Sequence, residues 1–321
     1  MTRSIDVLLL PDFNSAACHA FLDPLRAANY IDGSRHYSWR FLGTGSEPVR
    51  ASNGLIVQPE AVFSGDACDW LVVNASWAPE RFRHRTLQQR LRRVARSGAA
   101  VFALDTGAFV LGWAGLLEGE IACVHPEHAA AFRDTFPHIE LRDQLYTQGR
   151  GRVCCCGGIA AADLAIEIVK RDVGLPLAEA ARRYVFHPGA RGGHAPQQSE
   201  PSTAVDSNLP PVIRDALVLM SRNLEEPLAM ADVAHYVGCS QRQLERLFRR
   251  HTGRTPVRHY LELRLQHARA LLTQTNRSVS DIASDCGFGR SDAFARAYRR
   301  HFNIAPRDDR RLGRVPFEFR R

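Results

Sequence analysis

The chain lacks an apolar run long enough to cross a membrane. Its first apolar stretch follows Ser4 and ends at Pro11, which is too short for the core of a secretory signal or for a spanning helix. We therefore expect a protein of the cytoplasm that has no membrane partner.

Cysteine occurs eight times but lacks the spacing of a zinc site, and the sequence has no CxxC pair. Three cysteines are consecutive, Cys154 to Cys156, and neighbours on a strand point to opposite faces of a sheet. The pattern predicts reduced thiols, no metal site and no cofactor.

Lysine is absent from residue 210 onward, although that part of the chain is strongly basic. It holds 21 arginines against 12 acidic residues, a surplus of nine positive charges, whereas the rest of the chain carries a net charge of −1. A polyanion would therefore bind the C-terminal third. The N-terminal two-thirds has no electrostatic reason to touch DNA.

The same short pattern occurs twice in this basic third. Ala234 and Gly238 match Ala283 and Gly287 at an offset of 49, and the Arg-rich tails that follow match at an offset of 50. Each copy predicts a short helix, a turn with positive φ at glycine, and a longer helix, which is the pattern of a helix-turn-helix. Ser240 is suited to cap the longer helix of the first copy. One long helix, 256–275, joins the copies.

In each longer helix the apolar residues share one face. Leu244, Leu247 and Phe248 do so in the first copy, and Phe294, Ala297 and Tyr298 in the second. The opposite faces carry Arg242, Glu245, Arg246 and Arg249, and Ser291, Asp292, Arg296 and Arg299. Such helices could also belong to a structural bundle whose arginines are only solvated, but two matching copies favour DNA binding.

The basic third resembles the DNA-binding domain of AraC-type transcriptional regulators. The residues that carry the resemblance include Gly238-Cys239-Ser240, Leu244-Glu245-Arg246-Leu247-Phe248, Arg264-Leu265, Ile282-Ala283 and Gly287-Phe288. The resemblance implies two recognition helices in successive major grooves of double-stranded DNA. It implies that Arg242, Glu245, Arg246, Ser291, Asp292 and Arg296 read bases, and that Arg249, Arg299 and Arg300 meet phosphates. Activator action, RNA polymerase as a partner and a homodimer are further expectations.

Strands alternate with helices over residues 1–186 and predict an α/β sandwich around a mainly parallel sheet. We expect strands at 5–10, 37–42, 69–74, 99–104 and 152–156, a helix at 14–31 that Pro24 breaks or kinks, and a single helix at 79–96. Residues 187–209, rich in Pro and Gly, predict a flexible linker, so that an all-α domain with two helix-turn-helix units covers 210–321.

Residues 103–119, with 122–126 and 154–169, resemble PfpI-like proteins of the class I glutamine amidotransferase superfamily, which are flavodoxin-like in fold. That superfamily commonly has a Cys nucleophile at the elbow after the strand, paired with a downstream His, whereas this chain has Asp105 there and His125 at or near the His position. A carboxylate cannot replace the thiolate in amide hydrolysis, so we predict that the chain is not an enzyme. The alternative is an amidase- or hydratase-like domain fused to a DNA-binding module.

We expect the elbow to survive as a ligand pocket. A helix N-terminus would keep Asp105 ionised, and aromatic walls would then suit a cationic effector. The candidate ligand-binding residues are Phe13, Asn14, Trp77, Asp105, Thr106 and His125. Ordinary packing explains Phe13 and Trp77 equally well, and a structural hydrogen bond explains His125. The combination of DTGAF (105–109), CCGG (155–158), LERLFRRH (244–251) and YLELRL (260–265) resembles regulators of glycine betaine and carnitine catabolism. The resemblance implies a small quaternary amine or a related amino-acid effector, and arginine is an alternative.

Overall fold

A computed structural model describes residues 2–197, 209–275 and 277–311. The chain divides into two compact units, of which the first ends at Gln197. Each unit has its own hydrophobic core. Within the described ranges, no helix is both long enough and apolar enough to cross a bilayer.

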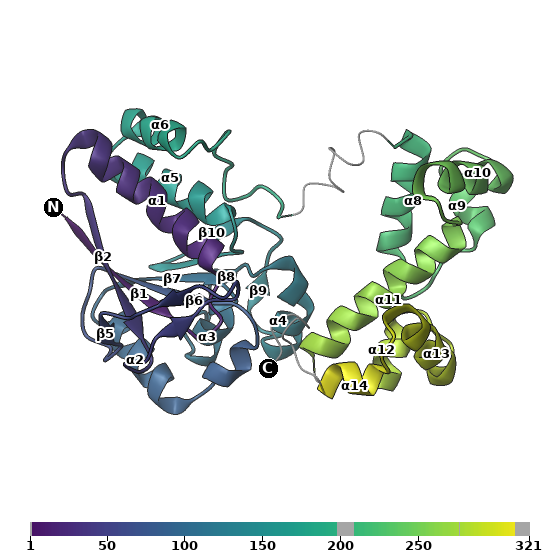
Figure 1. The fold of residues 1–321 in the computed structure, drawn as a ribbon, viewed down its shortest axis with the longest axis horizontal. Helices are drawn as coiled ribbons and strands as arrows, with labels where there is room; N and C mark the ends of the chain where they lie inside the picture. Colours follow the sequence, from purple (N-terminus) through teal and green to yellow (C-terminus); the bar gives the residue numbers. More distant parts are fainter. Residues whose placement is uncertain (1, 198–208, 276, 312–321) are drawn as a thin grey trace. The chain divides into compact units, whose positions relative to one another are not determined.

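The first unit is built on a seven-stranded sheet, and the mainly parallel α/β fold is confirmed (Figure 1). Every pairing is parallel except that of the first two strands in sheet order, which is antiparallel. In sheet order the strands are β10 (Tyr146–Gln148), β11 (Arg152–Cys155), β7 (Ala100–Asp105), β6 (Trp70–Ala75), β1 (Arg3–Leu9), β2 (Tyr37–Gly43) and β5 (Ala61–Val62). Strand β6 is buried along its whole length because helices cover both faces of the sheet.

Two sets of helices cover the two faces. Helices α1 (Ser15–Asp32), α5 (Ala160–Asp172) and α6 (Leu175–Tyr184) pack together over one face, and α2 (Arg85–Arg96), α3 (Gly107–Trp113) and α4 (Ala129–Thr135) contribute to the core over the other. The expected break at Pro24 is wrong, because α1 continues through it. The expected single helix at 79–96 is a 3₁₀ turn, η1 (Pro79–Phe82), followed by α2. Two small two-stranded sheets complete the unit: β3 (Val49–Arg50) with β4 (Ile56–Val57), and β8 (Ile121–Ala122) with β9 (Glu140–Leu141).

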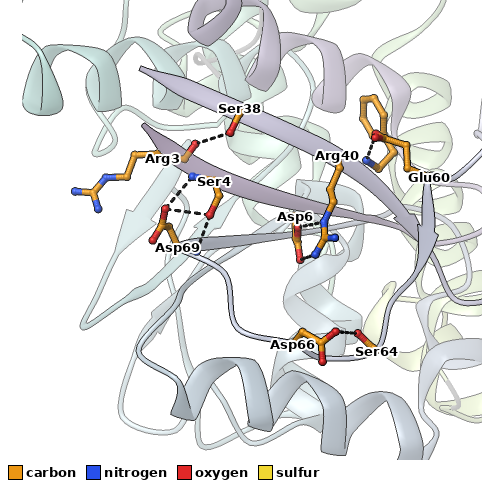
Figure 2. Close-up of polar contacts among 10 residues, drawn as sticks. Arg3, Ser4, Asp6, Ser38, Arg40, Glu60, Ser64, Asp66 and Asp69 are labelled. Carbon is orange, nitrogen blue, oxygen red and sulfur yellow. Dashed lines mark hydrogen bonds and ion pairs between the residues drawn. The ribbon is translucent and has the colours of Figure 1, made fainter. Parts of the chain in front are cut away.

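Polar side chains pin β1 to its neighbours (Figure 2). Arg40 of β2 donates from Nε and Nη2 to the two carboxylate oxygens of Asp6, at 2.6 and 3.0 Å. The Asp69 carboxylate accepts from the backbone N and the hydroxyl of Ser4, at 2.8 and 3.0 Å. Asp6 is buried, so the Arg40 guanidinium supplies the charge partner that a buried carboxylate requires.

Residues 187–197, called the strap below, correct the expected domain boundary. They were predicted to begin a flexible linker, yet they pack against the first unit. Arg191 donates three hydrogen bonds to the buried Asp163, and Leu145 N lies 3.1 Å from the carbonyl of Gly193 and 3.0 Å from that of Ala195. The unit therefore ends near Gln197 rather than at 186. The rest of the predicted linker, 198–208, lies outside the described residues.

The second unit consists of helices over the residues described. In chain order they are α8 (Pro211–Arg222), α9 (Met230–Tyr236), α10 (Gln241–Thr252), α11 (Pro256–Gln274), α12 (Val279–Asp285), α13 (Ser291–Phe302) and α14 (Pro306–Arg311). The two predicted pairs, α9 with α10 and α12 with α13, flank the long helix α11 (Figure 1). Ala234 and Ala283 are buried, as a close approach between the helices of each pair requires.

Candidate nucleic-acid interface and elbow site

The first helix-turn-helix has the local geometry that its residues predict. Gly238 in the turn has φ of 70°, which glycine adopts without strain. Ser240 begins α10 with a capping box: its hydroxyl accepts from Gln243 N at 3.3 Å, and Gln243 Oε1 accepts from Ser240 N at 2.9 Å. The turn and the start of the longer helix are therefore fixed by local hydrogen bonds.

The second copy repeats the first in its pattern of burial. Gly287 also has φ of 70°. Aligned residue by residue, α10 and α13 have the same burial class at every position except Gln243, which is exposed, against Ala293, which is partly buried. Two helices with different sequences thus bury equivalent faces and leave equivalent faces outward.

The residues predicted to contact DNA lie on these outward faces. Glu245 is partly buried and the others are exposed; the full set is Arg242, Glu245, Arg246 and Arg249 on α10, and Ser291, Asp292, Arg296 and Arg299 on α13. The inward faces carry Leu244 with Phe248, and Phe294 with Tyr298, all fully buried. The solvent-facing stripe on each longer helix is therefore polar and rich in arginine.

The two stripes differ in how their arginines are held. On α13, Asp292 accepts from Arg296 at 2.8 Å and from Arg290 at 3.0 Å. The hydrogen bond from Arg296 and that from Arg290 lower the pKa of Asp292 to about 2, so this carboxylate stays ionised. On α10, no ion pair holds Arg242 or Arg246 within the described part of the chain. The arginines of the α10 stripe are therefore free to meet a ligand, whereas Arg296 of the α13 stripe is paired with Asp292.

Helix α11 is attached to the second turn by Arg264. Its guanidinium donates to the carbonyls of Cys286 and Gly287, each at 2.7 Å, and lies 4.3 Å from the ring centroid of Phe288. Arg264 was singled out in the sequence only as part of the family pattern, and these contacts give it a structural role. It fixes the second turn on the helix that connects the two copies.

In the first unit, the elbow after β7 is a compact polar cluster. Asp105 has φ of 58°, the left-handed conformation that side chains other than glycine rarely adopt. Asn14 caps α1 by accepting from Ala17 N at 3.0 Å, and its Nδ2 donates to Asp105 Oδ2 at 2.7 Å. The hydroxyl of Thr106 donates to the carbonyl of Ser76. Strands β1, β6 and β7 thus bring these side chains together at their carboxyl ends.

The electrostatics of the elbow differ from the expectation that Asp105 is ionised. Burial raises the pKa of the Asp105 carboxyl, although His125 and the hydrogen bond from Asn14 act in the opposite direction. The cause is that Asp105 is only 3% exposed. The raised pKa acts against the expected ionisation of Asp105, and it weakens the electrostatic reason for a cationic ligand.

The other candidate ligand-binding residues differ in how far they are exposed to solvent. Phe13 and Thr106 are fully buried, so a ligand could reach them only after the elbow opens. Trp77, Asn14 and His125 are partly exposed. His125 Nδ1 accepts from Glu127 N at 3.3 Å, which is the structural hydrogen bond considered for it above. The structure brings Asn14, Asp105 and Thr106 together, and Phe13 belongs to the core.

The sequence did not single out Asn74, Ser76 or Gly157 as parts of this cluster. Asn74 Nδ2 donates to Asn14 O at 3.0 Å, and a Cβ at Gly157 would lie 3.0 Å from Asp105 Cβ. Asn74 and Ser76 lie at the carboxyl end of β6, and Gly157 lies just after β11, so the rule that sites lie at carboxyl ends of parallel strands could have found them.

Burial makes two of the cysteines, Cys123 and Cys154, poor candidates to replace the missing thiol. Burial raises the pKa of Cys154 to about 12 and that of Cys123 well above its ordinary value. A thiol with a raised pKa has almost no thiolate at neutral pH. Within the described ranges, no three metal-ligating side chains gather as a metal site would require.

These features define a DNA-binding transcriptional regulator that carries a separate α/β unit. A helix-turn-helix domain family matches residues 233–312. The HTH-type transcriptional regulator GbdR of Pseudomonas aeruginosa is 35% identical over 309 residues, which are 96% of this chain and 84% of that protein. The chain belongs to the AraC-type family of transcriptional regulators, which confirms the prediction that it is a DNA-binding transcriptional regulator.

Two solved structures are similar to this chain. An AraC family transcriptional regulator from Pseudomonas putida is 26% identical, covers 57% of this chain and 99% of its own, and has a TM-score of 0.51. A ThiJ/PfpI family protein from Pseudomonas syringae is 18% identical, covers 69% of this chain and 87% of its own, and has the same TM-score, 0.51. The second likeness concerns the fold alone, and it agrees with the predicted PfpI-like α/β unit.

Proposed function

We propose that this regulator reads promoter DNA with the outward stripes of α10 and α13. The equivalent burial of the two helices supports this, because it presents two arginine-rich faces from one unit. Arg242, Glu245, Arg246, Ser291, Asp292 and Arg296 contact bases in this proposal. Arg249, Arg299 and Arg300 contact phosphates, which position the protein without specifying sequence.

Binding to promoter fragments at several salt concentrations tests these roles. Loss of one phosphate contact in Arg299→Ala should weaken binding to all duplexes alike and reduce the salt slope by about 0.9. Loss of a base contact in Arg296→Ala should cost about 1–3 kcal/mol on the preferred sequence only. If both variants weaken all sequences equally, the division of roles is wrong.

We infer that the first unit senses a small molecule and does not transform one. Asp105 stands at the elbow in place of a thiol, its carboxylate is tied to Asn14, and the pKa values of Cys123 and Cys154 are raised by burial. Amide turnover by the full chain, abolished in Asp105→Ala, would contradict this and favour the amidase- or hydratase-like alternative.

A quaternary amine such as glycine betaine or carnitine is the effector class we propose. The support is the resemblance of the sequence to regulators of glycine betaine and carnitine catabolism, since the raised pKa of Asp105 weakens the argument from an ionised carboxylate. Betaine, carnitine, choline, dimethylglycine and arginine can be compared by thermal unfolding, because a ligand that prefers the native state raises its melting temperature. If arginine alone raises the melting temperature, arginine and not a quaternary amine is the effector.

A homodimer and a contact with RNA polymerase complete the proposal. Both come from the family resemblance, and sedimentation of the full chain with and without promoter DNA tests the first. A single monomer bound per operator at saturation would overturn the dimer.

A further inference from the structure

A cavity lies in the first unit, apart from the elbow. It has a volume of about 520 Å³, which is in the range of small-molecule sites. Its walls come from β10, from α5 and from the strap, through residues that include Tyr146, Glu167, Lys170 and Gly193. None of the six candidate elbow residues lines it.

Two of the side chains that line the cavity are cations that an anion could meet, Arg142 and Lys170, and Glu167 is the one carboxylate that lines it. Each cation is paired with a carboxylate, Lys170 with Glu167 and Arg142 with Glu140, which lies outside the lining. Lys170 Nζ lies 3.1 Å from Glu167 Oε2, and Arg142 Nε lies 2.6 Å from Glu140 Oε1. All four side chains are between 42% and 59% exposed, and such surface pairs contribute little, so a ligand can exchange for them at small cost.

The strap forms one wall of this cavity and is held closely to the domain. Gly193 is pressed against β10, because a Cβ there would lie 2.7 Å from Tyr146 Cε2. Gln197 Nε2 donates to Gln144 O at 2.7 Å, and Arg191 is tied to the buried Asp163. The strap is the last described segment before the chain continues toward the DNA-binding unit.

We propose that this cavity is a second small-molecule site, which takes an organic carboxylate and holds the strap in its docked position when occupied. Arg142 and Lys170 receive the carboxylate, and the strap closes against the remainder of the ligand. The site adds to the proposed sensing function but does not depend on the elbow.

Lys170 provides a direct probe, because it is the only lysine in the 321 residues. Reductive methylation with ¹³C-formaldehyde keeps the charge and labels only Lys170 and the N-terminal amine. Titration of the labelled full chain with sodium succinate should shift the Lys170 methyl signal to saturation. Sodium chloride at equal ionic strength should not, and Lys170→Arg identifies the signal by removing it. A shift that grows linearly, or equally with chloride, would overturn the site.

Two variants test whether succinate binds in the cavity or elsewhere on the surface. Arg142→Ala should weaken succinate binding about fivefold or more, the size expected for one lost charge-assisted contact. Arg171→Ala is the matched control, since Arg171 is the next residue along α5, is exposed and does not line the cavity. If Arg142→Ala binds as the wild type does, the assignment is wrong.

The strap is tested in the same samples by limited trypsin digestion. Succinate at saturation should slow cleavage after Arg191 at least about threefold in the wild type and much less in Arg142→Ala, because a ligand that favours the docked state lowers the open population that trypsin cuts. An unchanged rate despite saturable binding would overturn the coupling to the strap. Failure of this site leaves the quaternary-amine screen at the elbow as a separate result.

Discussion

Alanine substitutions at the two turn glycines, Gly238 and Gly287, should lower the stability of the second unit by different amounts. Gly238 and Gly287 have the same φ, 70°, so alanine at either position costs about 1–2 kcal/mol of backbone strain. Their surroundings differ. A Cβ at Gly238 meets nothing within 4 Å, whereas at Gly287 it would lie 2.5 Å from Cγ and Cδ of Pro227 and 2.9 Å from Glu225 O.

The added contact gives the size of the difference. Overpacking a filled site typically costs about 1–3 kcal/mol, and here a proline ring and a backbone carbonyl must both move. We therefore expect Gly238→Ala to destabilise the second unit by about 1–2 kcal/mol. Gly287→Ala should destabilise it by about 2–5 kcal/mol, which is a large part of the stability of a small domain.

The composition of the chain makes the assay specific to one unit. All four tryptophans, Trp39, Trp70, Trp77 and Trp113, belong to the first unit. Tryptophan fluorescence during urea unfolding therefore follows that unit only, and circular dichroism follows both. Either glycine variant should shift the dichroism transition and leave the fluorescence midpoint unchanged. Equal costs for the two variants, or a larger cost for Gly238→Ala, would refute the reasoning from space at the turn.

Three further predictions concern stability. Arg40→Ala should destabilise the first unit by about 1–3 kcal/mol in urea unfolding followed by tryptophan fluorescence, because it leaves Asp6 buried without a partner; adding Asp6→Asn should recover part of the loss. The pKa of Asp105 is raised in the folded state, so its contribution to stability is complete below the unfolded pKa, about 4, and is lost as the pH rises through the folded pKa. In melting curves across that range, Asp105→Asn should lose less stability than the wild type, and parallel curves would contradict the raised pKa. Ser240→Ala removes a capping box and should cost the second unit about 1 kcal/mol by circular dichroism, with no change in tryptophan fluorescence.

The helix-turn-helix pairs of the second unit could be predicted from the sequence because they depend on interactions between residues close together in the chain. The repeat offset, the turn glycines and the apolar faces all act within one or two turns of a helix, and the structure has positive φ at both glycines and a capping box at Ser240. The contact of Gly287 with Pro227 could not be predicted, because it joins residues 60 positions apart in the chain.

The first unit was predictable in its fold and less so in its site. Apolar runs identified the strands of the parallel sheet, but the state of Asp105 depends on how completely the surrounding elements exclude water. The strap was wrongly predicted to be part of a flexible linker, because its structure also depends on contacts with distant residues. Its Pro and Gly content is typical of linkers, whereas its docking depends on Asp163, a partner 28 residues away from Arg191. The continuation of α1 through Pro24 was also mispredicted because it depends on tertiary contacts. Packing of the helix on the sheet outweighs the low helix propensity of proline.

Selection of duplexes from a random pool by the full chain tests the central claim most directly. Two arginine-rich stripes on one unit predict an enriched motif with two conserved halves, about 10 base pairs apart from centre to centre. Arg246→Ala should relax one half and Arg296→Ala the other. An enriched motif with a single half, no enrichment at low salt, or the same half relaxed by both variants would contradict the claim that both repeats read DNA.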